Sequence, residues 1–396
     1  MRRRPAWRRI LRSGAGTSGW MTAFLLGMAA AMLLKLISAG GGMSESGSPH
    51  ARPGAGETAS EALEAGNEQA GGPRPMKDGS VGERDGFESQ TSEAVGRTGD
   101  GFGQTEAPDE PFVRVRLAEE GRVETVPLET YVRGVVAGEM PADFELEALK
   151  AQAIAARTYI VRKLLTAARA GEDGPEYDVT DGEGDQVYVP LEKFKAMQLE
   201  RKDDFKRIDR AVAETEGLVL TYDGEPIQAA YFSTSGGYTE NAGDYWSAEV
   251  PYLKSVPSPW DAQVSPQFER KVEMDLGEFY DRLGIGKKER KGGIEVLSRT
   301  EGRSVKEIRI GKRVLTGRKV REALGLPSAN FSWRIKGGRI ILTCYGHGHG
   351  VGMSQWGAQA LAMAGNSAEQ ILAYYYRGAR LAQSASLAAS SESFKT

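Results

Sequence analysis

Hydrophobic and polar residues alternate near residue 112, where the folded part of the chain is expected to begin. In the stretch FVRVRL, Val113, Val115 and Leu117 oppose Phe112, Arg114 and Arg116. This period of two predicts a β-strand with one buried face.

A longer segment, residues 141–170, repeats its apolar residues at steps of three and four. These residues are Leu146, Leu149, Ala153, Ala156, Ile160 and Leu164. Such spacing places them on one face of an α-helix. Pro141 suits the helix entry and Gly171 its exit, so we predict one long helix here.

Turn signals predict two hairpins further along. Asp223-Gly224 joins LVLTY to a return strand, IQAAYFS, and Gly337-Gly338 divides RIKGGRIILTCY. The second hairpin ends at Tyr345, and AEQILAYYY is predicted to be a closing helix. Residues 255–335 hold short strands and a helix, GRKVREALGL, and we interpret them as an inserted lobe.

These elements predict an α+β fold over residues 111–380. We expect a mixed-sheet core domain with one long helix, a smaller inserted lobe at residues 255–335, and a substrate cleft between them.

The first 37 residues carry a different pattern. Six arginines lie within residues 1–12, residues 13–34 are uncharged, and WMTAFLLGMAAAMLLKLISA is apolar enough to span a bilayer. We expect a cytoplasmic tail at residues 1–12 and a transmembrane anchor at residues 13–37, with the remainder extracytoplasmic. A cleaved signal peptide is the alternative, although LISAGG is a poor cleavage site and Lys35 can snorkel.

Composition sets the next segment apart. Residues 44–110 carry 14 acids against 5 bases, and residues 38–110 are rich in Gly, Glu, Ser and Ala. Such a segment buries too little apolar surface to fold, so we predict a disordered tether with a reach of about 45 Å. Residues 381–396 are predicted to be a disordered tail.

Charge and cysteine content exclude some classes. From residue 111 onward the net charge is about −1, which offers no basic face to nucleic acid. The single cysteine, Cys344, excludes an intrachain disulfide, and we expect it to be a buried, small apolar residue.

Three stretches combine residues that suggest chemistry: VVAGEMPADFELEALKAQAIAARTY, YFSTSGGYTENA and GHGVGMSQWGAQALA. In the first, we place Glu139 in a turn before the long helix, among Val135, Val136 and Met140. Apolar surroundings favour the protonated form of a carboxyl, which can then donate a proton. A carboxylate favoured by the dipole at a helix start is the alternative.

The second stretch places hydroxyls and glycines at the end of a strand. Gly236 and its neighbour let a ligand approach the backbone, and Ser233, Thr234 and Ser235 can bond its polar groups. Tyr231, Tyr238 and Trp246 could stack on its faces. A Ser/Thr-rich turn without function is the alternative, and the Gly-x-Ser-x-Gly pattern of a serine nucleophile is absent from the sequence.

The third stretch has histidines at 347 and 349 within a run of glycines. We favour a substrate-lining loop that directs His349 and Gln355 at the substrate or at Glu139, with Ser354 and Gln355 capping the next helix.

A metal site is the competing interpretation. Cys344, His347 and His349 could supply three zinc ligands, but strand alternation puts Cys344 on the other side. An acidic cluster could hold a hard cation, although a solvated loop is favoured. Its members are Asp178, Asp181, Glu183 and Asp185. We predict no metal and no cofactor.

Taken in order, the three stretches resemble the stage II sporulation protein D (SpoIID) family and related LytB-like amidase enhancers, over residues 112–380. The resemblance implies a lytic transglycosylase that cleaves the MurNAc-GlcNAc bond of peptidoglycan glycan strands. Its product is 1,6-anhydroMurNAc, and it acts during forespore engulfment in sporulation. In such a reaction one acid suffices, because the C6 hydroxyl of the sugar is the nucleophile.

The resemblance also assigns residues. Glu139 matches the catalytic acid, and Lys150 and Arg157 match polar positions of the active site. A solvated helix face, with Glu147 as a partner, is the alternative for these two cations. The candidate substrate-binding residues are Lys150, Arg157, Tyr231, Ser233, Ser235, Gly236, His349, Ser354 and Gln355. Some members bind structural zinc near the region equivalent to residues 177–188, which here contains no Cys or His.

Partners and location follow from the resemblance alone. It implies work with the amidase and endopeptidase SpoIIP and the membrane protein SpoIIM, in the mother-cell membrane facing the forespore. Two other classes remain open: a non-catalytic amidase enhancer that binds peptidoglycan, and a zinc-dependent cell-wall hydrolase.

Overall fold

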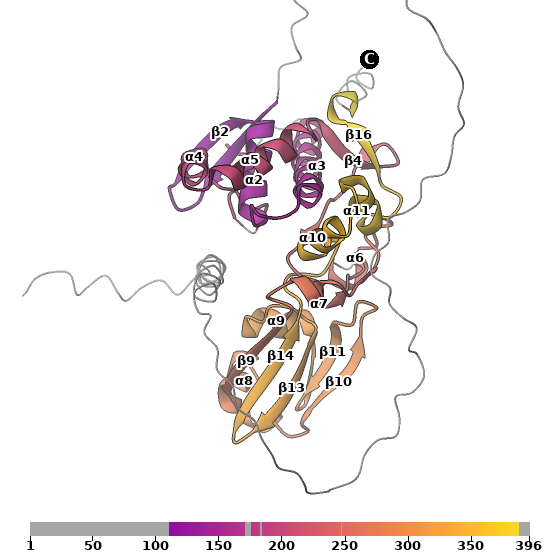
Figure 1. Cartoon of the computed structure of the whole chain (residues 1–396). Coiled ribbons are helices and arrows are strands. Elements are labelled where there is room, and N and C mark those ends of the chain that lie inside the picture. Colours follow the sequence, from indigo (N-terminus) through magenta and orange to yellow (C-terminus); the bar gives the residue numbers. More distant parts are fainter. Residues whose placement is uncertain (1–110, 171–175, 183, 247, 388–396) are drawn as a thin grey trace, which may run out of the picture. The chain divides into compact units, whose positions relative to one another are not determined.

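A computed structural model describes residues 111–170, 176–182, 184–246 and 248–387 (Figure 1). The expected cytoplasmic tail, membrane anchor and tether lie outside these residues. Among the residues described, no helix combines the length and apolar character needed to cross a membrane.

The predicted first strand is confirmed as β1 (Phe112–Leu117). Val113, Val115 and Leu117 are its buried positions. It pairs antiparallel with β2 (Arg122–Pro127) and parallel with β3 (Val179–Thr180). Pro127 then leads into α2 (Leu128–Glu139), a helix in a stretch whose sequence shows only an apolar run.

The predicted long helix is α3 (Leu146–Ala170). It starts later than expected, because residues 141–144 form a turn in which Phe144 N donates to Pro141 O. The expected single apolar face is wrong for the middle of the helix, where residues 148–158 are nearly all buried, apart from Lys150. The reason is packing: several helices contact α3, namely α2, α5 (Lys202–Ala213), α10 (Gln355–Met363) and α11 (Ala368–Tyr375). Next to α5 lies α4 (Leu191–Glu200).

The first predicted hairpin is only partly present. Asp223 and Gly224, with φ of 51° and 82°, make the turn between β4 (Leu218–Tyr222) and β5 (Glu225–Pro226). The return strand stops at Pro226, which has no N–H to donate to the ladder. β6 (Tyr231–Phe232) instead pairs parallel with β15 (Met353–Ser354).

The chain beyond residue 380 also differs from expectation. β16 (Arg380–Gln383) pairs antiparallel with β4, so residues 381–383 belong to a sheet and not to a disordered tail. Leu381 packs against the first hydrophobic core, which accounts for this order.

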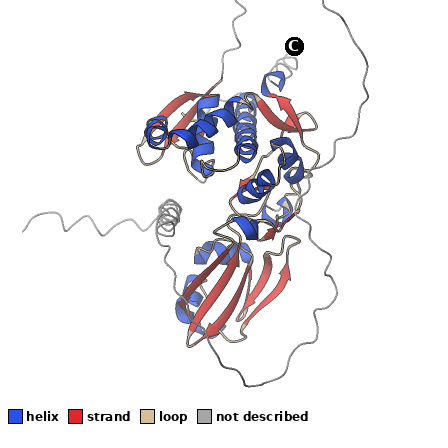
Figure 2. Cartoon of the chain, in the orientation of Figure 1, coloured by secondary structure: helices blue, strands red, loops and turns tan. Residues whose placement is uncertain are grey.

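A second hydrophobic core takes its residues from Met274 to Cys344. Two three-stranded sheets and two helices surround it. They are β13 (Phe331–Lys336), β14 (Arg339–Tyr345) and β9 (Glu269–Asp275); β10 (Ile294–Arg299), β11 (Val305–Ile310) and β12 (Arg313–Thr316); and α8 (Leu276–Arg282) and α9 (Gly317–Leu324). Gly337 and Gly338 form the predicted turn between β13 and β14, with φ of 59° and 77°. Figure 2 shows that strands dominate this core, whereas helices dominate the first.

Short elements complete the described chain: β7 (Gly237–Tyr238), α6 (Ala242–Trp246), β8 (Pro257–Ser258), α7 (Asp261–Val264) and the 3₁₀ turn η2 (Lys287–Glu289). The predicted mixed α+β class is confirmed, with several small sheets in place of one large one.

Candidate functional site

Glu139 was predicted to lie in a turn, but it is the last residue of α2. Its side chain is partly exposed. One carboxylate oxygen accepts from Val187 N at 2.8 Å, and the other accepts from Gln355 Nε2 at 3.2 Å. Two N–H donors thus fix the carboxylate while leaving it open to solvent.

Two glycines in α2 allow the Val187 backbone to reach Glu139. A Cβ on Gly138 would lie 2.5 Å from Val187 O, and one on Gly134 would lie 2.3 Å from the Tyr188 ring. Val189 N also donates to Gly134 O. The small residues four apart let an extended segment lie directly on the helix, and this spacing is the sequence signal that could have predicted the contact.

Gln355 comes to Glu139 from the far end of the chain. It opens α10, and it is 5% exposed. Its Nε2 also lies 3.4 Å from Gln152 Oε1, on α3. The predicted direction of Gln355 toward Glu139 is present in the structure, and Gln152 is a member of the site that sequence reasoning missed.

A chain of polar groups runs beside the carboxylate. Tyr131 Oη donates to Gln186 Oε1 at 3.1 Å, and Gln186 Nε2 donates to Tyr231 Oη at 2.8 Å. Burial, followed by the charge of Glu139, raises the pKa of Tyr231 well above its ordinary value. Tyr231 therefore remains a neutral phenol near Glu139, in line with its selection as a candidate.

Ser235 and Ser354 are buried structural residues. Ser235 is 1% exposed and Ser354 is 0% exposed, and both bond to Asp261. Ser354 is the N-cap of α10, as predicted, because its hydroxyl accepts from Gly357 N at 3.2 Å. Direct sugar contact by these two hydroxyls is not supported in this conformation. Ser233 is partly exposed, and its carbonyl accepts from Trp356 N at 3.1 Å.

The glycine-rich loop is as tight as the sequence suggested. Gly346, Gly348, Gly350 and Gly352 all have φ between 77° and 114°. A Cβ on Gly352 would lie 2.0 Å from Ala230 O. Both the backbone conformation and the close approach require glycine.

His349 lies within this loop among aromatic rings. The rings of Phe232, Tyr245 and Trp246 are 5.5 to 5.7 Å away. Its Nδ1 accepts from Val351 N at 3.1 Å, and its side chain also bonds to the backbone of Tyr231. Burial, followed by repulsion from Arg321, lowers the pKa of His349 to about 4. The structure thus uses His349 as a neutral ring that braces the loop through backbone atoms of Val351 and Tyr231.

Gly236 and His349 line a small pocket together with Tyr238, Glu240, Ser304 and His347. Glu240 is 5% exposed, and burial raises its pKa. Ser304 N donates to Glu240 at 3.3 Å. The guanidinium of Arg303 lies 4.3 Å from the Tyr238 ring centre, so one face of this predicted stacking residue is already covered.

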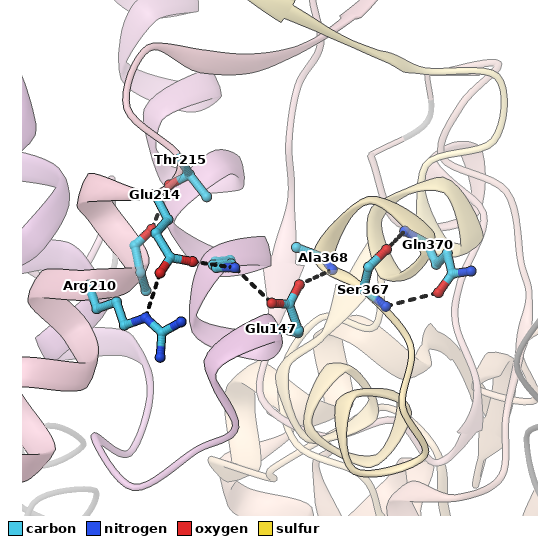
Figure 3. A network of polar contacts seen from close by, with 9 residues as sticks. Glu147, Arg210, Glu214, Thr215, Ser367, Ala368 and Gln370 are labelled. Carbon is cyan, nitrogen blue, oxygen red and sulfur yellow. Dashed lines mark hydrogen bonds and ion pairs between the residues drawn. The ribbon is translucent and has the colours of Figure 1, made fainter. Parts of the chain in front are cut away.

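Lys150 belongs to a network that joins three helices. Its Nζ lies 2.8 Å from Glu147 and 2.6 Å from Glu214, at the end of α5. Figure 3 shows that Glu147 also accepts a hydrogen bond from Ala368 N, at the start of α11, and that Glu214 forms an ion pair with Arg210. The pairing with Glu147, left open by the sequence, is present, and the predicted contact of Lys150 with substrate is not supported.

Arg157 is 0% exposed. It makes a bidentate ion pair with Glu129, in the first turn of α2, and donates to Leu218 O at 3.1 Å. A guanidinium in this position ties α2, α3 and β4 together. The prediction that Arg157 binds substrate is therefore corrected, because the group is inaccessible.

The acidic residues on either side of β3 are occupied by internal partners. Asp178 pairs with Arg114, Asp181 accepts from Ala118 N, and Asp185 pairs with Lys163; Glu183 lies outside the described residues. Among the described residues there is no group of three or more His, Cys, Asp or Glu side chains placed to hold a metal. Cys344 is buried at 0% exposure, as predicted, and burial raises the pKa of its thiol to about 11.

Comparison with known proteins identifies the family to which the sequence is related. The family described as "SpoIID: Stage II sporulation protein" matches residues 118–222. Two proteins named Stage II sporulation protein D are each 45% identical to this chain. The one from Bacillus subtilis (strain 168) aligns over 265 residues, which are 66% of this chain and 76% of the relative. The one from Bacillus amyloliquefaciens aligns over 262 residues, with the same shares.

A more distant relative carries another name. The Amidase enhancer of Bacillus subtilis (strain 168) is 31% identical over 304 residues, which are 63% of this chain and 40% of the relative. The matched family and these identities define a cell-wall-related sporulation protein. The chain belongs to the stage II sporulation protein D family.

Proposed function

We propose that this protein is a peptidoglycan lytic transglycosylase that acts in sporulation, with Glu139 as its only acid and base. The observation that carries the proposal is the Glu139 carboxylate, which is partly exposed and held on both oxygens by Val187 N and Gln355 Nε2.

The reaction balances with one carboxyl group. Protonated Glu139 gives its proton to the glycosidic oxygen as the bond from that oxygen to C1 of MurNAc breaks. The C6 hydroxyl of the same MurNAc forms the new bond to C1, and its proton returns to Glu139. The nucleophile belongs to the substrate, so proximity supplies the second function that a carboxylate would otherwise fill.

The neighbours of Glu139 suit this cycle. The donors Val187 N and Gln355 Nε2 stabilise the carboxylate that exists between the two proton transfers. Tyr231 and Ser233, both partly exposed, are candidates for contacts with the sugar, as is Gly236 in the neighbouring pocket. The proposed glycan path runs past these residues, in the cleft expected between the core domain and the inserted lobe.

The proposal includes location and partners. Residues 13–37 would anchor the chain in the mother-cell membrane, with the catalytic region extracytoplasmic and facing the forespore. SpoIIP would remove stem peptides and cleave cross-links, which would supply the denuded glycan strands, and SpoIIM would be a membrane partner.

The test is incubation of the purified full-length protein with glycan strands stripped of stem peptides, followed by mass spectrometry. Glu139→Gln serves as the matched control. Fragments ending in 1,6-anhydroMurNAc, absent with the variant, would support the proposal. Fragments with ordinary reducing ends would mean that water is the nucleophile and would reject it.

A second candidate is a non-catalytic amidase enhancer, which the similarity to the Amidase enhancer favours. It predicts no cleavage by either form, together with faster cleavage of peptidoglycan by an added amidase. Glu139→Gln would leave that enhancement unchanged.

A further inference from the structure

Asp261 lies at the junction of two of the motif stretches. It is 0% exposed. Its Oδ1 accepts from Ser235 N at 2.7 Å and from the Ser354 hydroxyl, and its Oδ2 accepts from Ser258 Oγ at 2.6 Å. One carboxylate therefore joins the end of the YFSTSGG stretch to the start of α10.

The connection continues to the catalytic carboxyl. Ser354 caps α10, and the next residue, Gln355, donates to Glu139. The first turn of α10 is pressed against Asp261, since a Cβ on Gly357 would lie 2.9 Å from Asp261 Oδ2 and 2.0 Å from Tyr375 Oη. A shift of Asp261 would thus move the helix start that carries Gln355.

We propose that Asp261 is a positioning residue for the reaction: through Ser354 it fixes the start of α10 and so aims the Gln355 amide at Glu139. The inference rests on the proposed function, and it gives the buried aspartate a role that does not require contact with the substrate.

The hydrogen bonds of Asp261 indicate which substitution at this position should preserve activity. Ser235 N can only donate, so Oδ1 must remain an acceptor. Ser258 Oγ lies 2.9 Å from Tyr375 Oη and can reverse its hydrogen bond. An asparagine can therefore keep Oδ1 as its carbonyl oxygen and donate from the other position to Ser258, whereas an alanine loses all three contacts.

The experiment compares full-length Asp261→Ala, Asp261→Asn and the wild type on glycan strands. We expect Asp261→Ala to lower kcat by about 100-fold with KM changed less than about threefold, because a displacement near 1 Å is enough for such a loss. Asp261→Asn should restore kcat to within about fivefold of the wild type. Asp178→Ala is the matched control, since Asp178 is also paired internally but lies outside the site, and its kcat should be unchanged.

Ser354→Ala keeps the test decisive if Asp261→Ala does not fold. It removes the Asp261 to Ser354 link, together with the bonds that the Ser354 hydroxyl accepts from Ser235 N and Gly357 N, while Asp261 keeps its own bond from Ser235 N. It should lower kcat by about 100-fold, and where Asp261→Ala does fold, the double variant should be no worse than either single one. Equal kcat losses for Asp261→Ala and Asp178→Ala, or additive losses in the double variant, would overturn the proposal.

A second measurement separates this proposal from the proposed function. The side-chain amide resonances of Gln355, assigned in ¹⁵N-glutamine-labelled protein with Gln355→Ala, report its contact with Glu139 whether or not glycan is cleaved. They should shift in Asp261→Ala and stay in place in Asp261→Asn. Unmoved resonances in Asp261→Ala would reject the positioning role, while an inactive wild type with the expected shifts would reject only the transglycosylase.

Discussion

Two carboxylates bond to consecutive residues at the start of α10, and their surroundings differ. Glu139 bonds to Gln355 and is partly exposed, whereas Asp261 bonds to Ser354 and is 0% exposed. Both accept hydrogen bonds from a backbone N–H and from a side chain. Access, and not the supply of donors, distinguishes the two carboxylates: Glu139 is open to a substrate, as the proposed reaction requires, whereas Asp261 is enclosed.

The largest expected effect comes from removing the exchangeable proton at Glu139. Glu139→Gln should lower kcat by about 10³-fold, within the range that a general acid contributes, because an amide cannot donate and recover the proton. Glu139→Asp keeps the acid but withdraws it by one methylene from Val187 N and Gln355, and a loss of about 100-fold is expected. Both are measured as initial rates of 1,6-anhydro product formation, beside thermal unfolding. An active Glu139→Gln would show that Glu139 is not the acid of the reaction.

The second effect concerns pH and stability. Burial outweighs the hydrogen bonds and raises the pKa of Asp261 from 3.8 to about 6, with Tyr375 of α11 as its titratable neighbour. The folded state therefore binds the Asp261 proton more tightly than the unfolded state does. This difference adds to the free energy of unfolding; the contribution is fully present below pH 3.8 and is lost as pH rises through 6. The shift corresponds to about 3 kcal/mol.

Asp261→Asn removes this dependence, and denaturant unfolding at several pH values measures it. The free energy of unfolding of Asp261→Asn minus that of the wild type should rise by about 2.5 kcal/mol between pH 4 and pH 7. His349 has the opposite sign: its lowered pKa, about 4, gives stability that is present above pH 6.5 and lost as pH falls through 4. A flat difference for Asp261→Asn would mean that Asp261 is ionised in the folded protein throughout this range.

The same comparison explains how far the sequence could predict the site. Glu139 is predicted from its apolar neighbours and its place in the first motif stretch, and Gln355 from its place in the glycine-loop motif, so both predictions depend on the family resemblance. Asp261 was missed because it lies outside the motif stretches, and only the folded chain brings it to Ser235 and Ser354. A motif shows only which residue types occur in a short stretch. The partners of the buried Asp261 carboxylate, Ser235 and Ser354, lie 26 and 93 residues away in the chain.

Prediction of the fold succeeded where the pattern was local. The β13–β14 hairpin was predicted because Gly337 and Gly338 provide the left-handed turn, and β1 because of its alternation. The prediction that Arg157 binds substrate came from the family resemblance, with a solvated helix face as the alternative, and neither fits a guanidinium that is 0% exposed. Here its partner Glu129 lies 28 residues away in the chain, and the pair is enclosed by packing that no periodicity reveals.

The third test separates Glu139 from the segment that supplies Val187 N. Gly138→Ala would place a Cβ 2.5 Å from Val187 O, so the segment must move away from α2. We expect a loss of about 1–3 kcal/mol in unfolding free energy from overpacking, and a decrease in kcat of about tenfold as one donor leaves Glu139. Gly182→Ala is the control, because no heavy atom lies within 4 Å of the point that its Cβ would occupy. An unchanged kcat in a destabilised Gly138→Ala would show that Val187 N is dispensable for the reaction.

The smallest effect is expected at Lys150, which the family resemblance places among the substrate contacts. Its side chain is 17% exposed and lies between Glu147 and Glu214, two carboxylates that outweigh the effect of burial and raise its pKa. Lys150→Met keeps the aliphatic stem and should cost no more than about 1 kcal/mol of stability, because Glu147 retains its bond to Ala368 N. KM for glycan strands should be unchanged, since the group that the substitution removes is already engaged by α5 and α3. A KM raised about fivefold or more, with stability unaltered, would instead return Lys150 to the substrate path and extend the accessible region of the site beyond Glu139.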